Sequence, residues 1–356
     1  MKCFVAILVI LLFGGSAFGQ EETPAQDESE QARGYTTREE RRSAGLKYKI
    51  TDQITLTGLF ESEYIYEGFK LDDDSRAHED EFSAPLQLGL EMVASSWAKV
   101  ELVYEFDIAI NEHILDEAIL ILEAGDFDVE LGKVYMPFGE YFSHFVTGPI
   151  LEFGETRDAG AVLSYTPDDR IDLSTFVYKG RALQEDPDSS SLDWGFSAEY
   201  SPFEFGTLAI SYLSDLADSQ EHFLSESNHR YENRVPALSG YALIGYGAFE
   251  VTAEFVHALS SFEELDAEQN KPRAWNLELA YYPRNDLELA FRYERSKEFE
   301  DGPTYKIGFG ATWHASKHVY VSLEYLHGKF RREFSEESED PEPRTLHQFG
   351  ARISFL

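Results

Sequence analysis

The stretch Leu279–Leu289, LAYYPRNDLEL, sets a pattern that the rest of the chain repeats. Apolar and polar residues alternate up to a short turn at Pro283–Asp286, and the alternation starts again at Leu287. Leu163–Leu173, LSYTPDDRIDL, is a second copy, with its turn at Pro167–Arg170. A period of two places successive side chains on opposite faces of a strand. The pattern therefore predicts antiparallel strands joined by tight turns, with an aromatic side chain just before each turn.

The first 46 residues stand apart from this pattern. Residues 1–19 predict a secretory signal peptide, because Lys2 precedes an apolar run of about ten residues, Phe4–Phe13, that is too short to span a bilayer. An N-terminal membrane anchor is the alternative. Residues 20–46 are acidic and carry little apolar surface, so we expect a disordered periplasmic leader. The single cysteine, Cys3, lies within the signal, which leaves the mature chain without a disulfide or a thiolate metal ligand.

The charge balance excludes one class of partner. The sequence holds 30 Lys and Arg against 66 Asp and Glu, a formal net charge of −36. Nucleic acid is excluded, because phosphate binding needs a basic surface. Excess carboxylates near a channel mouth would favour cations, although the same excess also serves solubility and mutual repulsion.

The hydrophobic pattern leaves one way to cross a membrane. After the signal no run of about 18 apolar residues occurs, so the sequence predicts no transmembrane helix. The remaining structure that can span a bilayer is a closed β-barrel, because it pairs every backbone N–H and C=O group by hydrogen bonds between strands. From Ile54 onward we count about 16 strands of the length that a tilted barrel strand needs. The sequence predicts an all-β fold, a transmembrane antiparallel β-barrel at residues 47–356. A soluble β-sandwich or a jelly roll is the alternative.

The connections alternate between short turns and long acidic segments. The long ones are Lys70–Glu79, Gln184–Ser191, Asp215–Arg234, Ser260–Lys271 and Phe330–Arg344. Short periplasmic turns and long outer loops are the arrangement of Gram-negative outer-membrane barrels, and we expect that location. The final strand ends with Phe355 one residue from the end of the sequence. This ending resembles the outer-membrane assembly signal, which implies the barrel assembly machinery as a partner.

One outer segment is apolar and aromatic where the others are acidic. It follows the fifth strand, Phe127–Tyr135, and is the predicted third extracellular loop. Folding it into the lumen would bury its aromatic side chains and narrow the pore. The alternative is that the loop packs over the rim or against a neighbouring subunit.

The same segment carries a resemblance to a known family. Gly-Lys-x-Tyr-x-Pro-Phe-Gly at Gly132–Gly139, Ser-His at Ser143–His144 and Gly-Glu-Thr-Arg at Gly154–Arg157 resemble the LbtU-type siderophore porins. The resemblance implies an outer-membrane barrel that moves ferric siderophore without an energy-coupling protein. A general cation-preferring porin is the alternative cargo assignment. A barrel adhesin is an alternative of another class.

The predicted lumen is ionic. Ten glutamates face inward if the apolar set faces lipid: Glu91, Glu101, Glu105, Glu130, Glu199, Glu250, Glu254, Glu278, Glu288 and Glu324. Basic side chains expected to oppose them are Lys99, Lys179, Arg292 and Arg352. Facing rows of opposite charge build a transverse field in porins, although the same groups could simply pair to satisfy a polar interior.

Ten residues are expected at the pore constriction or along the solute path. They are Lys133, Tyr135, Phe138, Tyr141, His144, Glu152, Glu155, Arg157, Arg292 and Arg352. Arg157 with Glu152 and Glu155 is the expected eyelet. The scattered histidines form no motif with a nucleophile, so the sequence predicts no catalytic site, and it predicts no metal site or cofactor. Outer-membrane lipid and lipopolysaccharide are expected partners, and a homotrimer is one candidate assembly.

Overall fold

The computed structural model describes residues 45–168, 170–180, 192–203, 205–219, 233–265, 270–298, 302–330 and 342–355. The chain divides into two units, residues 1–34 and 35–356, and every described residue belongs to the second. The predicted signal peptide and nearly all of the predicted leader lie outside the described residues, as does the expected loop at 184–191. Among the described residues no helix is long and apolar enough to cross a bilayer.

The described residues form eighteen β-strands and one short 3₁₀ helix. The first nine strands are β1 (Leu46–Thr51), β2 (Ile54–Leu71), β3 (Arg76–Ser83), β4 (Pro85–Ser95), β5 (Ala98–Asp107), β6 (Glu112–Ala124), β7 (Phe127–Tyr135), β8 (Arg157–Asp168) and β9 (Ile171–Lys179). The others are β10 (Leu192–Phe203), β11 (Gly206–Leu213), β12 (Ala237–Tyr246), β13 (Phe249–Ala258), β14 (Arg273–Arg284), β15 (Leu287–Lys297), β16 (Tyr305–Ser316), β17 (Val319–Lys329) and β18 (Pro343–Phe355). The 3₁₀ helix is η1 (Ile150–Gly154).

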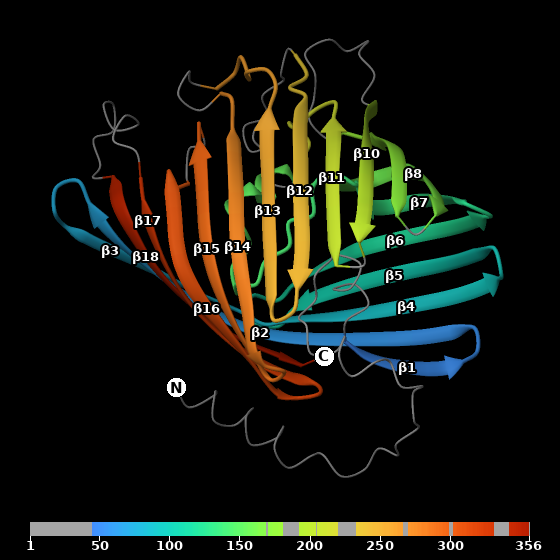
Figure 1. Ribbon diagram of the computed structural model, residues 1–356, viewed down its shortest axis with the longest axis horizontal. Helices are drawn as coiled ribbons and strands as arrows, with labels where there is room; N and C mark the ends of the chain where they lie inside the picture. Colours follow the sequence, from blue (N-terminus) through green and yellow to red (C-terminus); the bar gives the residue numbers. More distant parts are fainter. Residues whose placement is uncertain are drawn as a thin grey trace. The chain divides into compact units, whose positions relative to one another are not determined.

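Sixteen of these strands close into a ring (Figure 1). β2 pairs antiparallel with β4, each strand from β4 to β17 pairs with the next, and β18 pairs back onto β2. The closing seam runs from Phe60 opposite Phe355 to Leu71 opposite Pro343. The predicted fold class, an antiparallel barrel of 16 strands, is confirmed. Closure leaves the ring without an open edge, which is what a bilayer requires.

Two further strands pair with β2 and were not expected. β1 pairs with the first residues of β2, and β3 pairs with its second half from Glu63 to Lys70. The expected loop at Lys70–Glu79 is therefore wrong, because β2 runs to Leu71 and β3 begins at Arg76. β3, RAHEDEFS, is polar on both faces and shows no apolar alternation, so its pairing was not visible in the sequence.

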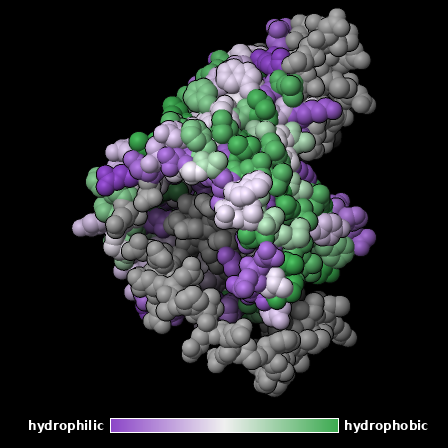
Figure 2. Space-filling model, turned by 90° about the vertical axis from the view of Figure 1, so that its right-hand side faces the viewer, coloured by the Kyte–Doolittle hydropathy of each residue, from purple (hydrophilic) through white to green (hydrophobic). Residues whose placement is uncertain are grey.

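The two faces of the ring differ as the alternation predicts. On β14, Leu277, Leu279 and Tyr281 are 39%, 41% and 40% exposed on the outward face, whereas Glu278 and Ala280 are fully buried on the inward face. Figure 2 shows hydrophobic residues gathered on the outer wall. Apolar side chains thus point outward instead of lying between two sheets, which excludes the β-sandwich alternative.

Candidate functional site: the barrel lumen and its third loop

The third loop, residues 136–156, folds into the barrel as predicted. Its side chains Phe138, Phe145, Leu151 and Phe153 are at most 1% exposed. It joins β7 to β8 and contains η1, and η1 packs against β13, β14 and β15. The loop therefore lies inside the ring and narrows its interior.

Glutamates on β13 and β14 accept hydrogen bonds from the loop backbone. Glu254 accepts from the N–H groups of Glu140, at 2.7 Å, and Tyr141, at 2.9 Å. Glu278 accepts from the hydroxyl of Ser143, at 3.0 Å, and from the N–H of His144, at 2.8 Å. This part of the loop has no helix or strand to satisfy its N–H groups, so the carboxylates take that role.

Two further glutamates continue this ladder along the loop. Glu324 on β17 accepts from the N–H groups of Val146, at 2.6 Å, and Thr147, at 3.1 Å, and from the Thr147 hydroxyl at 2.8 Å. Glu294 on β15 accepts from the N–H of Ile150 at 2.7 Å. Charged acceptors make stronger hydrogen bonds than neutral ones, so the loop is tied to the wall at four positions.

Arg292 on β15 is a cation that also binds the third loop to the barrel wall. Its guanidinium is fully buried and lies 2.8 Å from Glu278. It donates to the carbonyl oxygens of Thr147, at 2.8 Å, and Gly148, at 3.2 Å, and also to the Ser143 hydroxyl. The loop turns around this side chain, since both its carbonyl and its N–H groups bond to one Arg–Glu network.

Arg352 on β18 and His144 hold the remaining sides of the loop. Arg352 lies 3.2 Å from Glu63 and donates to the Phe145 carbonyl at 3.3 Å. The His144 ring lies between Glu288, 2.8 Å from Nδ1, and Glu250, 3.4 Å from Nε2. An imidazolium donates from both ring nitrogens and matches this pair of carboxylates.

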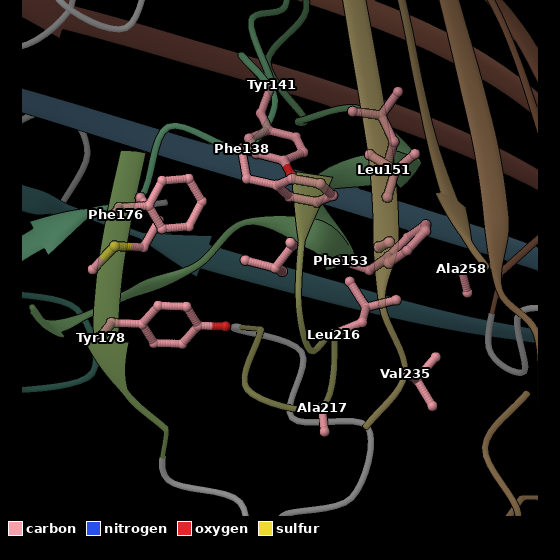
Figure 3. Packing of buried hydrophobic residues seen from close by; sticks show 14 of the residues in the cluster. Phe138, Tyr141, Leu151, Phe153, Phe176, Tyr178, Leu216, Ala217, Val235 and Ala258 are labelled. Carbon is pink, nitrogen blue, oxygen red and sulfur yellow. The ribbon is translucent and has the colours of Figure 1, made fainter. Parts of the chain in front are cut away.

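The other side of the loop packs into an apolar cluster (Figure 3). Phe138, Tyr141, Leu151 and Phe153 from the loop gather there with side chains of β6–β9, β11–β14 and the β11–β12 and β13–β14 loops. Tyr178 of β9 belongs to the cluster and donates its hydroxyl to the Asp215 carbonyl at 3.1 Å. The third loop thus fills the side of the lumen bounded by these strands.

The opposite wall, made of β2, β4 and β5, carries carboxylates that are partly exposed. Glu61, Glu63 and Glu101 have side chains that are 25%, 19% and 28% exposed. The register sets Glu91 directly opposite Glu101 on the same face. Lys99 lies 3.3 Å from Glu101 and is 32% exposed. This acidic wall, Glu61, Glu63, Glu91, Glu101 and Glu105, therefore keeps part of its carboxylate surface accessible to solvent.

Three of the ten expected path residues lie elsewhere. Lys133 and Tyr135 of β7 alternate with the inward, fully buried Val134, and Tyr135 stands opposite Arg157 of β8. All three therefore face outward, which corrects the expected lumen position and the expected eyelet at Arg157. Arg157 pairs there with Asp116.

Other expected positions need smaller changes. Glu152 and Glu155 lie half-buried within the third loop, so the expected eyelet is not assembled with Arg157. Lys179 is exposed and alternates with the fully buried Tyr178, so it faces outward and does not oppose the lumen glutamates as expected. Phe138, Tyr141, His144 and Arg292 are inside, but they are buried in the loop packing.

Sequence reasoning missed several lumen carboxylates, among them Glu294, Glu61 and Glu63. Glu294 lies two residues beyond Arg292 on the same strand face, so the alternation already placed it inward. Glu61 and Glu63 alternate with Phe60 and Tyr64 on β2 in the same way. The period of two therefore indicates the inward orientation of these three carboxylates. Their contacts with the loop or with Arg352 become visible only in the folded structure.

One acidic cluster in the described residues has the spacing of a metal site. The carboxylates of Asp193, Asp215 and Asp218 lie within 4.8 Å of one another and are buried. Arg234 lies 2.6 Å from Asp193, and Asp215 accepts from the N–H groups of Ala217 and Val235, both at 3.1 Å. A guanidinium and backbone amides therefore already engage Asp193 and Asp215, and we assign no cation to the cluster.

The fold is similar to that of outer-membrane channels of known structure. The outer membrane channel DcaP of Acinetobacter baumannii matches with a TM-score of 0.59 and 14% identity, over 88% of this chain and 100% of its own. OprB of Pseudomonas putida matches with a TM-score of 0.60 and 11% identity, over 84% and 94%. A mutant of the Rhodopseudomonas blastica porin matches with a TM-score of 0.55 and 14% identity, over 85% and 100%. Likeness at these identities concerns the fold alone.

Sequence comparison adds one relative. A UPF0422 protein of Coxiella burnetii is 28% identical over 214 residues, which are 55% of this chain and 42% of that protein. The match thus spans less than half the length of the relative. No protein-family model matches the chain.

Proposed function

We propose that the protein is a channel of the Gram-negative outer membrane that passes small solutes and prefers cations. The closed ring with an apolar outward face supports the location. The likeness in fold to porins supports the channel activity. The observation that carries the cation preference is the acidic wall, whose carboxylates stay partly exposed opposite a loop that is tied down.

The charges along the acidic wall determine whether the channel prefers cations or anions. Lys99 and Arg352 are the basic side chains that ion-pair with carboxylates of the acidic wall among the described residues. On the acidic wall itself, five carboxylates therefore stand against these two cations. A low-dielectric wall concentrates this negative potential and raises the local concentration of cations.

Reversal potentials across planar bilayers test this proposal. Purified protein in a KCl gradient should give ohmic steps whose reversal potential indicates K⁺ over Cl⁻. The double variant Glu91→Gln/Glu101→Gln should move the reversal potential toward zero. Asp72→Asn, in the turn between β2 and β3, is the matched control and should leave it unchanged. A preparation without conductance steps would overturn the channel proposal and favour a barrel adhesin or an enzyme, and anion preference would overturn the proposed cation preference.

A finer proposal concerns the cargo. The resemblance of Gly132–Arg157 to LbtU-type siderophore porins supports ferric siderophore as a solute taken up without energy coupling. Growth on ferric siderophore as iron source should depend on the gene both with and without the energy-coupling protein. Growth that is independent of the gene would remove the siderophore proposal and leave the channel proposal standing. As an outer-membrane barrel, the protein is also proposed to be inserted by the barrel assembly machinery and to form a homotrimer. Cross-linking in membranes tests the trimer.

A further inference from the structure

The outward face of β13, β14 and β15 gathers basic side chains at its extracellular end. The register sets His257 beside Arg273, and Arg273 beside Lys297. The side chains of Arg273 and Lys297 are 41% and 47% exposed. Such a row stands out in a chain with 66 acidic and 30 basic residues.

A second row lies two residues nearer the periplasmic end of the same face. Phe255 stands beside Trp275, Trp275 beside Arg295, and Arg295 beside Tyr305 of β16. Trp275 also meets Tyr293 edge to face, with ring centroids 5.1 Å apart. Aromatic side chains at this level mark the boundary between hydrocarbon and headgroups in barrel proteins. The basic row therefore stands at headgroup height.

These two rows enclose a groove on the outer wall. Its volume is about 610 Å³, and its lining includes His257, Arg273, Arg295 and Lys297 with Phe255 and Trp275, but no acidic residue. Figure 1 shows the three strands side by side on one wall of the ring. Below the groove, the outward face continues with Leu277 and Leu279, which are exposed and apolar.

The local charges leave the groove positive. Glu298, just past β15, lies 3.6 Å from Arg273 and 3.1 Å from Lys297 and is 17% exposed. Arg295 forms no ion pair with any residue that the structure describes. Among the residues that the structure describes around the groove, three cations, Arg273, Arg295 and Lys297, thus stand against one carboxylate, Glu298.

We propose that this groove binds the phosphorylated headgroup of a glycolipid of the outer leaflet, with the acyl chains lying along the apolar wall below it. Arginine pairs with phosphate through two parallel hydrogen bonds, and basic residues beside a membrane attract anionic headgroups. The inference uses the proposed outer-membrane location but not the channel activity. It assigns a role to basic residues that the lumen does not use.

Native mass spectrometry of the full chain in detergent, titrated with bis-phosphorylated lipid A, tests the proposal. Arg273→Gln and Arg295→Gln should each weaken binding about fivefold, and the double variant about 25-fold, since one basic side chain near a membrane contributes about 1 kcal/mol. Arg284→Gln, an exposed arginine at the opposite end of β14, is the matched control and should leave binding unchanged. Arg295→Lys should retain most of the binding.

The comparison ligands distinguish the sources of phosphate. A phosphate-free lipid A analogue and inorganic phosphate alone should both bind at least tenfold more weakly than lipid A. Equal binding of the phosphate-free analogue, equal binding of inorganic phosphate, or an equal loss in Arg284→Gln would each overturn the inference. Conductance is recorded on the same preparation. Wild-type protein that conducts normally but does not bind lipid A removes this inference alone, and wild-type protein that binds lipid A but does not conduct removes the channel proposal alone.

Discussion

Replacing Arg292 with methionine should release the third loop while leaving the barrel closed. The Arg292 guanidinium is fully buried and bonds both to Glu278 and to the loop carbonyls of Thr147 and Gly148. It also lies over the Phe145 ring, 4.3 Å from its centre. The side chain therefore joins wall and loop at one point.

The magnitude follows from what the substitution leaves behind. Arg292→Met leaves the buried carboxylate of Glu278 without its cationic partner. Glu294, whose carboxylate lies 3.8 Å from the Arg292 guanidinium, loses one of its two cationic partners and keeps Lys306. Removing one partner of a buried ion pair costs about 3–5 kcal/mol. The backbone hydrogen bonds between neighbouring strands are unchanged, so we expect this energy to be lost from loop packing and not from ring closure.

Single-channel recording measures the outcome. Arg292→Met should give larger and noisier conductance steps, with an unchanged heat-modifiable band on electrophoresis. Arg295→Met, on the outward face of the same strand, is the matched control and should change stability by less than about 0.5 kcal/mol. The double variant Arg292→Met/Glu278→Gln should recover about 0.5–3 kcal/mol, because the stranded charge is gone. Wild-type conductance and wild-type stability in Arg292→Met would refute this account of the loop.

Three further substitutions test other parts of the structure. His144→Gln leaves two buried carboxylates facing a neutral amide and should destabilise the third loop by about 3–5 kcal/mol, which faster proteolytic cleavage within the loop would reveal. Phe138→Ala should lower the free energy of unfolding in urea by about 3–5 kcal/mol, because its side chain is fully buried in the apolar cluster. Gly132→Ala should cost about 1–3 kcal/mol in the same assay, since its φ is +141° and a Cβ would meet the Ala118 carbonyl oxygen. Its control, Gly125→Ala, also has positive φ but open space around it, and equal losses in the two variants would contradict the steric argument.

The alternation of apolar and polar residues with a period of two predicts most of the fold. It placed the strands and their inward and outward faces from side chains alone, because each barrel strand has one apolar and one polar face. It failed at β3, where both faces are polar. At Lys133 the same alternation indicates the outward face, which Lys133 shares with Leu131, and not the pore path expected for it.

The roles of the lumen glutamates were beyond the sequence. Glu254 and Glu324 were expected to line a pore, yet they accept hydrogen bonds from loop N–H groups that are 113 and 178 residues away in the chain. Alternation shows which face a side chain takes, but not what stands opposite that face. A loop without regular secondary structure supplies unsatisfied N–H groups, and its position becomes known only when the ring is assembled.

The seam between β2 and β18 also bears on how the molecule forms. Phe60 and Phe355 are neighbours in the ring although almost the whole barrel sequence separates them. Contacts this remote carry a large loop-closure entropy and make folding slow, so the hairpins between consecutive strands can assemble well before the cylinder shuts. Until that final pairing, β2 and β18 expose unpaired edges, and such edges invite aggregation in an unfinished sheet.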